Sequence, residues 1–182
     1  MQFGGGQQYD RILKFPYRGA PQTVSVIKEA ALASQEDSYA VRELAERICA
    51  HLPSKAYGDE YQAIYRFVLA RTRYMRDPRT VELVRQPTVV AKQLASGNVP
   101  ALDCDDQAAL ICALVLAVGG QCDVVTVAFK HAFHQGVRQY SHVFARALEP
   151  SSGLWMIMDP VAADDTKGMR RRAVHAKIWP VA

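Results

Sequence analysis

Apolar residues recur at helical spacing in the first half of the chain and at strand spacing in much of the second half. One amphipathic run predicts a helix from about Tyr39 to Leu52, which Pro53 ends. A second run predicts a helix from about Glu60 to Arg73. A shorter helix is expected from about Val89 to Ala95, with Gly97 as its C-terminal stop. The first half is therefore expected to be mainly helical.

A third long helix is expected from about Cys104 to Val118, before the pair Gly119–Gly120. It is apolar on nearly every face, which indicates a helix buried on all sides and not one lying on the surface. Three strands are expected after it, at Val124–Phe129, Tyr140–Leu148 and Leu154–Met158. Helices followed by strands predict an α+β domain in which an antiparallel sheet packs on this central helix.

The two ends of the chain carry weaker patterns than the middle. Residues 1–35 are read as an N-terminal arm that could dock on the domain or on a partner, because Pro16 and Pro21 interrupt regular structure. Within it, residues 23–33 fit a short helix or a strand equally well. Residues 36–165 form the expected domain, and residues 166–182 a basic C-terminal tail.

Length, composition and charge narrow the class of protein. The chain has 182 residues, enough for one domain with a real core, and its 49% apolar and 22% charged residues are typical of a soluble globular protein. The net charge of +4 is too mild to argue for nucleic-acid binding, and Arg170–Arg172 are read as a solvated run. No stretch approaches the ~20 apolar residues that cross a bilayer, and no signal peptide is expected.

The four cysteines do not predict a disulfide framework or a zinc site. A chain of this size without a secretion signal does not need bridges, and no C-x-x-C pair is present. Cys49 and Cys112 lie on apolar helical faces and are read as small core residues, and Cys122 opens a strand and is expected to pack as well. Cys104 differs because it starts the central helix.

Cys104, His142 and Asp159 occur in the order nucleophile, base and orienting acid. A cysteine in the first turn of a helix gains from the positive end of the helix dipole and from nearby amides, which could also serve an oxyanion. His142 lies in a strand and Asp159 follows the next strand. Each residue has an ordinary structural reading, but together they supply the three parts of a thiol acyl-transfer enzyme.

Three aspartates surround the candidate nucleophile. Asp103, Asp105 and Asp106 suit a helix start, yet their charge works against a thiolate, so Cys104 would depend on a protonated imidazole. A calcium site at these carboxylates is disfavoured because the glycine turn and the distal glutamate of such loops are missing. We expect neither a metal nor a cofactor.

These motifs resemble the transglutaminase-like superfamily of papain-like cysteine enzymes over roughly Tyr57–Ala162. The resemblance rests on Asp103–Asp106 opening an apolar helix that ends at Ala117–Gly120, on Tyr140–Phe144, and on Trp155–Pro160. It implies a papain-like core with the nucleophile at the start of the buried helix.

The resemblance also implies roles for single residues. Cys104 would be the nucleophile, His142 its base and Asp159 the orienting acid. Gln93 and Asn98 are candidates for the side-chain donor of an oxyanion hole, although neither lies in a clear motif.

Two further segments bear on the same resemblance. Tyr74 and Asp77 look like a family element of structural role ahead of the cysteine loop. The chain departs from the family at His142–Phe144, which reads His-Val-Phe where His-Ala-Trp is common. The substitution keeps an aromatic residue.

The sequence thus predicts thiol-dependent acyl transfer on a peptide or protein amide. The residues do not decide between hydrolysis and transglutaminase cross-linking, and the resemblance favours hydrolysis. The alternative, implied by the resemblance to bacteriophage-associated proteins with an Asp-Cys-Asp-Asp motif, is a structural or assembly protein with a silent or maturation-only triad, partnered by phage structural proteins or by self-association through residues 1–35. A nucleic-acid partner rests only on Arg170–Arg172. A cytoplasmic or virion-associated location is expected.

Overall fold

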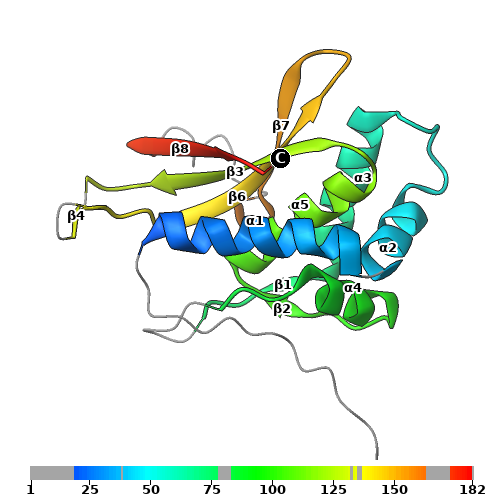
Figure 1. Cartoon of the computed structure of the whole chain (residues 1–182), viewed down its shortest axis with the longest axis horizontal. Helices are drawn as coiled ribbons and strands as arrows, with labels where there is room; N and C mark the ends of the chain where they lie inside the picture. Colours follow the sequence, from blue (N-terminus) through cyan, green and yellow to red (C-terminus); the bar gives the residue numbers. More distant parts are fainter. Residues whose placement is uncertain are drawn as a thin grey trace, which may run out of the picture.

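The computed structural model describes residues 19–37, 39–77, 83–131, 133–134, 137–162 and 173–181, and in these it is an α+β fold. Its helices are α1 (Ala20–Asp37), α2 (Tyr39–Cys49), α3 (Tyr57–Arg71), α4 (Pro87–Ala95) and α5 (Cys104–Ala117). Its main strands are β3 (Gln121–Ala128), β6 (His142–Glu149), β7 (Leu154–Met158) and β8 (His175–Pro180) (Figure 1). The predicted fold class is confirmed at this level.

Helix α5 is the centre of the core. Every side chain from Asp105 to Val115 is buried, as its uniformly apolar sequence predicted. The other four helices and strands β3 and β6 all contact it. Its predicted start at Cys104 is confirmed, and the helix ends at Ala117, one residue before the predicted Val118.

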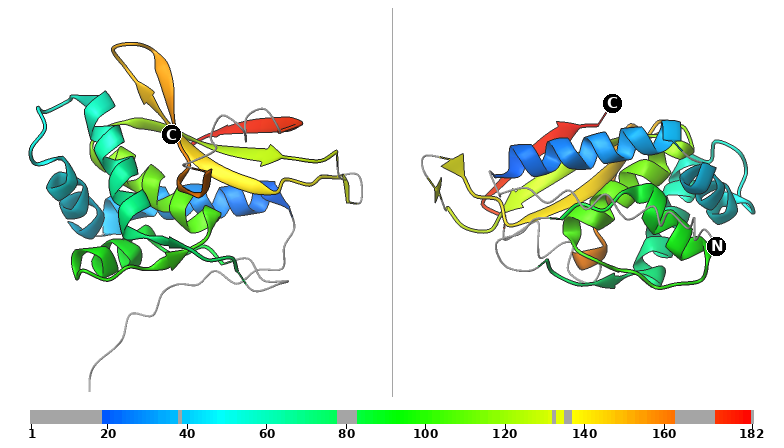
Figure 2. Two further views of the ribbon diagram at one scale, coloured as in Figure 1. Left: turned by 180° about the vertical axis from the view of Figure 1, so that it is seen from behind. Right: turned by 60° about the horizontal axis from the view of Figure 1, so that its bottom comes forward.

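The four main strands form one antiparallel sheet in the order β7-β6-β3-β8. Apolar side chains on one face of the sheet, such as Val124, Ala145 and Met158, join the core with α5 and α1. Val125, Val127 and Phe144 belong to a separate, smaller cluster. The helices therefore lie against one face of the sheet, as the views from behind and from below show (Figure 2).

Two short strand pairs and one 3-10 turn complete the described structure. Strand β1 (Arg73–Tyr74) pairs in parallel with β2 (Ala101–Leu102), directly ahead of α5. Strands β4 (Phe133–His134) and β5 (Val137–Arg138) form a hairpin between β3 and β6. A single 3-10 turn, η1 (Pro160–Ala162), follows β7.

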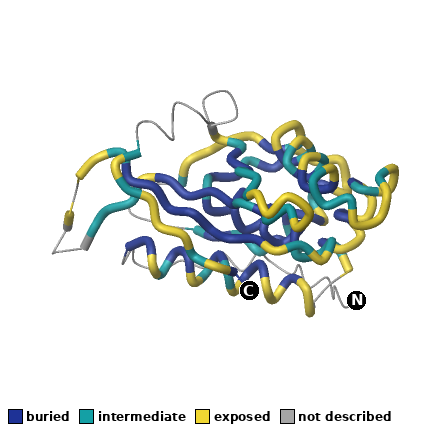
Figure 3. Tube along the Cα trace, turned by 90° about the horizontal axis from the view of Figure 1, so that it is seen from above, coloured by how far each residue is buried: buried dark blue, intermediate teal, exposed yellow. Residues whose placement is uncertain are grey.

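Residues 20–37, most of which were assigned to an arm, form the 18-residue helix α1. Val24, Ile27 and Ala31 are buried in the core that α5 shares, so the expected boundary at residue 35 falls inside a packed helix. Figure 3 shows α1 with one buried and one exposed side. Pro21 is compatible with this helix because it occupies the first turn, where its missing N–H has no intrahelical partner.

The expected tail also contributes to the fold. Strand β8 pairs with β3 from Asp123↔Pro180 to Ala128↔His175 and is the edge strand on that side of the sheet. The run Arg170–Arg172 and residues 1–18 lie outside the described residues. None of the described helices combines the length and apolar character needed to cross a membrane.

We predict that Ile27→Ala lowers the free energy of unfolding by about 2–5 kcal/mol, because the side chain is fully buried and its removal leaves a cavity. Leu32→Ala in the same helix is the matched control, since Leu32 is 40% exposed. Urea unfolding of both variants tests this. Equal and small effects would show that α1 is a dispensable arm.

Candidate active site

His142 and Asp159 form a buried, hydrogen-bonded pair at one end of the sheet. His142 is the first residue of β6, Asp159 directly follows β7, and their side chains are 7% and 2% exposed. Imidazole Nε2 lies 2.8 Å from Asp159 Oδ2. Two of the three predicted site residues are therefore in direct contact, and the contact involves Nε2, so Nδ1 is the nitrogen left to face another group.

Asp159 is held in place by more than the imidazole. Its other carboxylate oxygen, Oδ1, accepts a hydrogen bond from the Val161 amide at 3.2 Å. Its backbone carbonyl accepts one from the Tyr65 hydroxyl of α3 at 3.0 Å. A carboxylate fixed in this way can set both the orientation and the tautomer of the imidazole.

Cys104 is the first residue of α5, and its side chain is half-buried. The turn at Gly119–Gly120 sends the chain back from α5 along β3, whose last residues pair with the start of β6 at Val127↔His142. Since α5 is about 21 Å long and β3 about 26 Å, this connectivity favours a position for Cys104 towards the end of the sheet where His142 lies, and the meeting of the two side chains stays a prediction.

Asp103 caps α5. Its Oδ1 accepts hydrogen bonds from the amides of Asp105 and Asp106, both at 3.0 Å. From the sequence, the first-turn amides were candidates for part of an oxyanion hole. For Asp105 and Asp106 that expectation is wrong, because the cap already engages both amides.

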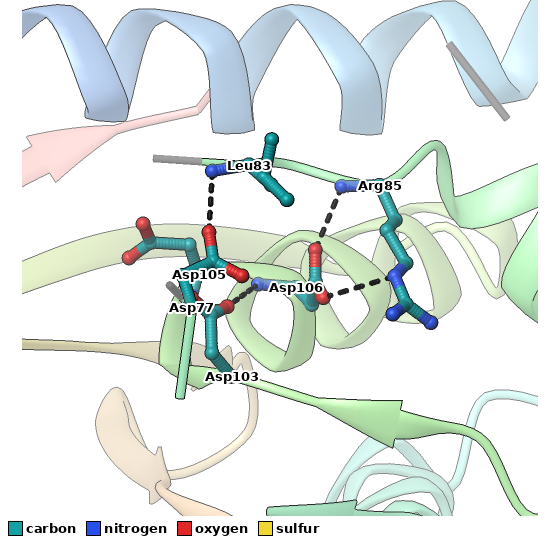
Figure 4. Close-up of polar contacts among 6 residues, drawn as sticks. All are labelled: Asp77, Leu83, Arg85, Asp103, Asp105 and Asp106. Atoms are coloured by element: carbon teal, nitrogen blue, oxygen red, sulfur yellow. Dashed lines mark hydrogen bonds and ion pairs between the residues drawn. The ribbon is translucent and has the colours of Figure 1, made fainter. Parts of the chain in front are cut away.

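The remaining aspartates are also engaged (Figure 4). The Cys104 thiol lies 3.7 Å from Asp105 Oδ1. Asp106 accepts a hydrogen bond from the Arg85 amide at 2.7 Å and pairs with its guanidinium Nε at 3.6 Å. Asp77 accepts one from the Leu83 amide. These contacts attach residues 83–85 to the start of α5.

Burial dominates the electrostatics of Asp106. It raises the pKa of this carboxyl to about 6, although the Arg85 amide and guanidinium lower it and Asp77 raises it further. A charged Asp106 is therefore disfavoured by folding, despite its basic neighbour.

Tyr74 is a neighbour of the thiol that the sequence analysis had given only a structural role. Burial, followed by the charge of Cys104, raises the pKa of its phenol, and a hydrogen bond with Arg76 lowers it. Tyr74 pairs in register with Leu102, two residues before the cysteine. A parallel pair of strands so short has no clear sequence pattern, so its position could not be read from the chain.

The two oxyanion candidates lie at the C-terminal end of α4. Gln93 Oε1 is buried without a hydrogen-bond partner among the described residues, and its backbone carbonyl accepts from the Asn98 amide at 3.0 Å. The Asn98 side chain is exposed. Neither amide group has a described hydrogen bond that aims it at a substrate, so both remain predictions.

The other three cysteines lie in less reactive settings. Burial, followed by the charge of Glu60, raises the pKa of Cys49 to about 11. Cys112 and Cys122 are fully buried neighbours, and their mutual contact together with burial raises the pKa of Cys112 well above its ordinary value. Among the described residues, no group of three or more His, Cys, Asp or Glu side chains is arranged to hold a metal.

Comparisons with known proteins support the fold alone. No family model matches the chain, and no curated protein matches it. One solved structure, described as a "putative protease" from Parabacteroides distasonis, is similar with a TM-score of 0.58 and 13% identity. The match covers 91% of this chain but only 30% of that chain, so the similarity concerns one part of a larger protein.

We predict that Asp106 makes stability depend on pH in an unusual direction. Because its pKa rises from 3.8 to about 6 on folding, the folded state holds the proton more tightly. Lowering the pH from about 7 to about 4 should then add roughly 2 kcal/mol to the free energy of unfolding from this group, and the full effect of about 3 kcal/mol is reached only below the unfolded pKa of 3.8.

The measurement compares urea unfolding of the parent and Asp106→Asn at both pH values. The advantage of the parent over the variant should grow as the pH falls. Asp59→Asn is the control, since Asp59 is exposed. A pH-independent difference between the parent and Asp106→Asn would contradict the prediction.

Proposed function

We propose that this chain is a thiol-dependent acyl-transfer enzyme of the transglutaminase-like, papain-like type, acting on amide bonds and normally transferring the acyl group to water. The observation that carries the proposal is the buried His142–Asp159 pair, 2.8 Å between Nε2 and Oδ2, at the end of the sheet towards which the topology favours a position for Cys104. A carboxylate hydrogen-bonded to an imidazole in this way orients the imidazole and stabilises the charged form that it takes when it acts as a base.

The reaction follows from the roles of these groups. His142 takes the thiol proton, and the Cys104 thiolate attacks the amide carbonyl carbon to give a tetrahedral oxyanion. The oxyanion collapses, the C–N bond breaks, and the imidazolium gives its proton to the leaving amine. Water, deprotonated by His142, then attacks the thioester and releases the acid and the thiol. Asp159 stabilises the imidazolium at each stage.

Asp159 bonded to Nε2 supports this assignment, because Nδ1 remains for the thiol proton. The aspartates near Cys104 oppose a thiolate, so the mechanism depends on the imidazolium as counter-charge. Hydrolysis agrees with the description of the structurally similar protein, although that similarity extends only to the fold. Transamidation differs only in the acceptor and is the second outcome of the same chemistry.

The assembly reading and its partners remain predictions. Residues 1–18, the part of the expected arm outside α1, and Arg170–Arg172 both lie outside the described residues. The site geometry does not favour an assembly role over an enzymatic one. We therefore retain the enzyme as the conclusion.

The first prediction concerns the thiol. The rate at which iodoacetamide alkylates Cys104 should rise with pH, and the pH at its midpoint should lie well below the ~8.5 of a free thiol. The reason is that the imidazolium stabilises the thiolate. His142→Ala should move the midpoint towards that of a free thiol. Because Cys49 and Cys112 have raised pKa values and Cys122 is buried, mass spectrometry of the modified peptides should find Cys104 modified first.

His51→Ala is the matched control, since His51 is exposed on the turn after α2. It should leave the midpoint unchanged. If Cys104 titrates like an ordinary thiol with His142 present, the catalytic reading is lost.

The second prediction concerns the acceptor. We incubate the protein with a mixture of glutamine-containing peptides and a primary amine. The amount of acid formed by hydrolysis of the peptides should exceed the amount of amine joined to them. Cys104→Ala should lower turnover by at least about 10³-fold, because the covalent route is removed. Asp159→Asn should lower it less, since the imidazole survives. Dominant amine incorporation would instead assign the chain to cross-linking.

A further inference from the structure

Strand β1 has an open edge beside the candidate nucleophile. The Arg73 and Met75 amides donate to the carbonyls of Pro100 and Leu102, at 3.0 and 2.9 Å. Because backbone groups alternate sides along a strand, the N–H and C=O of Tyr74 point away from β2. Within the described part of the chain, β1 pairs only with β2, and no backbone group is bonded to the Tyr74 N–H or C=O.

The side chains along this edge are exposed and carry positive charge. All four residues from Arg73 to Arg76 are exposed, with Tyr74 at 44% and Met75 at 53%. An exposed edge strand with unpaired backbone groups is a template for another extended chain. Two arginines and two large apolar side chains, one an aromatic ring, supply both charge and contact area.

The acidic residues nearby do not cancel this charge at the surface. Asp103 and Asp106 are buried and accept hydrogen bonds from the α5 amides and from Arg85. Asp77 accepts from the Leu83 amide. Over the described residues 73–77, the charge exposed at this edge is therefore that of Arg73, on β1, and of Arg76, two residues after it.

The edge also lies within reach of the thiol. Tyr74 is in register with Leu102, two residues before Cys104, and its phenol is near enough to the thiol to feel its charge. A chain added at the open edge would lie two strand spacings, about 10 Å, from β2, so its side chains or its end would have to reach past Tyr74 to the thiol.

We propose that β1 binds the acyl-donor substrate as an added strand, through the Tyr74 N–H and C=O, and that the substrate is an extended peptide segment bearing acidic side chains opposite Arg73 and Arg76. The inference rests on the proposed function and names the substrate class for it. Main-chain bonds give the affinity, and the two arginines give the preference for acidic side chains.

The test uses acetyl-Glu-Ala-Ala-Glu-Ala chloromethyl ketone, whose glutamates have the three-residue spacing of Arg73 and Arg76, and the same probe with N-methylated peptide bonds. In each, the Cys104 sulfur displaces chloride and forms a thioether, so labelling does not require turnover. Each rate is divided by the rate with free N-acetylcysteine. The unmethylated probe should label Cys104 at least about tenfold faster than the methylated one, since methylation removes donors needed for strand pairing.

Tyr74→Pro and Tyr74→Ala form the matched pair of variants. Both lack the phenol, but only proline lacks the outward N–H, and proline is tolerated at an outward-facing position of an edge strand. The advantage of the unmethylated probe should persist in Tyr74→Ala and fall to about one- to twofold in Tyr74→Pro. Iodoacetamide should label the two variants at equal rates, which shows that the thiol itself is the same in both.

Charge is tested separately with acetyl-Lys-Ala-Ala-Lys-Ala chloromethyl ketone, which has the same spacing as the acidic probe. The parent should prefer the acidic probe about two- to fivefold, and Arg73→Glu combined with Arg76→Glu should reverse the preference.

Three results would overturn the inference. One is equal labelling by the methylated and unmethylated probes, and another is an equal advantage in Tyr74→Pro and Tyr74→Ala. The third is a melting temperature several degrees lower for Tyr74→Pro than for Tyr74→Ala, which would show that the chain itself already occupies this edge. The ratio of the labelling rates of the two probes does not depend on the reactivity of the thiol. It therefore still reports strand pairing even if His142→Ala shows that no ion pair activates Cys104.

Discussion

The burial of α5 on every side is the constraint on which the rest of the structure depends. A helix with no polar face must be covered all round, and the described fold does this with four helices and two strands. Its polar residues are confined to the first turns, where Asp103 caps the helix and Asp105 and Asp106 follow Cys104. The same requirement that buries the helix therefore leaves its N-terminus as the place where chemistry can occur.

Strand register then decides what meets that end. Across β3 and β6, Arg146 donates from Nε and Nη2 to Asp123 Oδ2 at 2.9 and 2.6 Å, and its guanidinium lies 4.0 Å from the centre of the Trp155 ring on β7. These contacts join three strands in one register, and a slip of one residue would turn side chains to the opposite face. The same register puts the ends of β6 and β7 where His142 can reach Asp159.

Aspartates and arginines of opposite charge lie around Cys104, and amino-acid composition does not show which of them face the solvent. Asp105 lies against the thiol, while Arg85 holds Asp106 and Arg76 hydrogen-bonds Tyr74. The net effect on a substrate depends on which charges face outwards. Here the carboxylates of Asp103, Asp105 and Asp106 are buried and Arg73 and Arg76 are exposed, so the two signs are separated by depth.

The sequence by itself determined the elements whose local pattern is strong. The start of α5, the bounds of β7 and the α+β class follow from apolar periodicity and from helix-stop and turn residues. Its order of Cys104, His142 and Asp159 also identified two residues that prove to be in contact. Only the tertiary structure decided that residues 20–37 are a core helix, that residues 175–180 are a strand, and that β1 lies beside the cysteine. The physical reason is that these segments gain their stability from distant partners, α5 for the helix and β3 or β2 for the strands, and a local pattern carries no information about a partner far away in the chain.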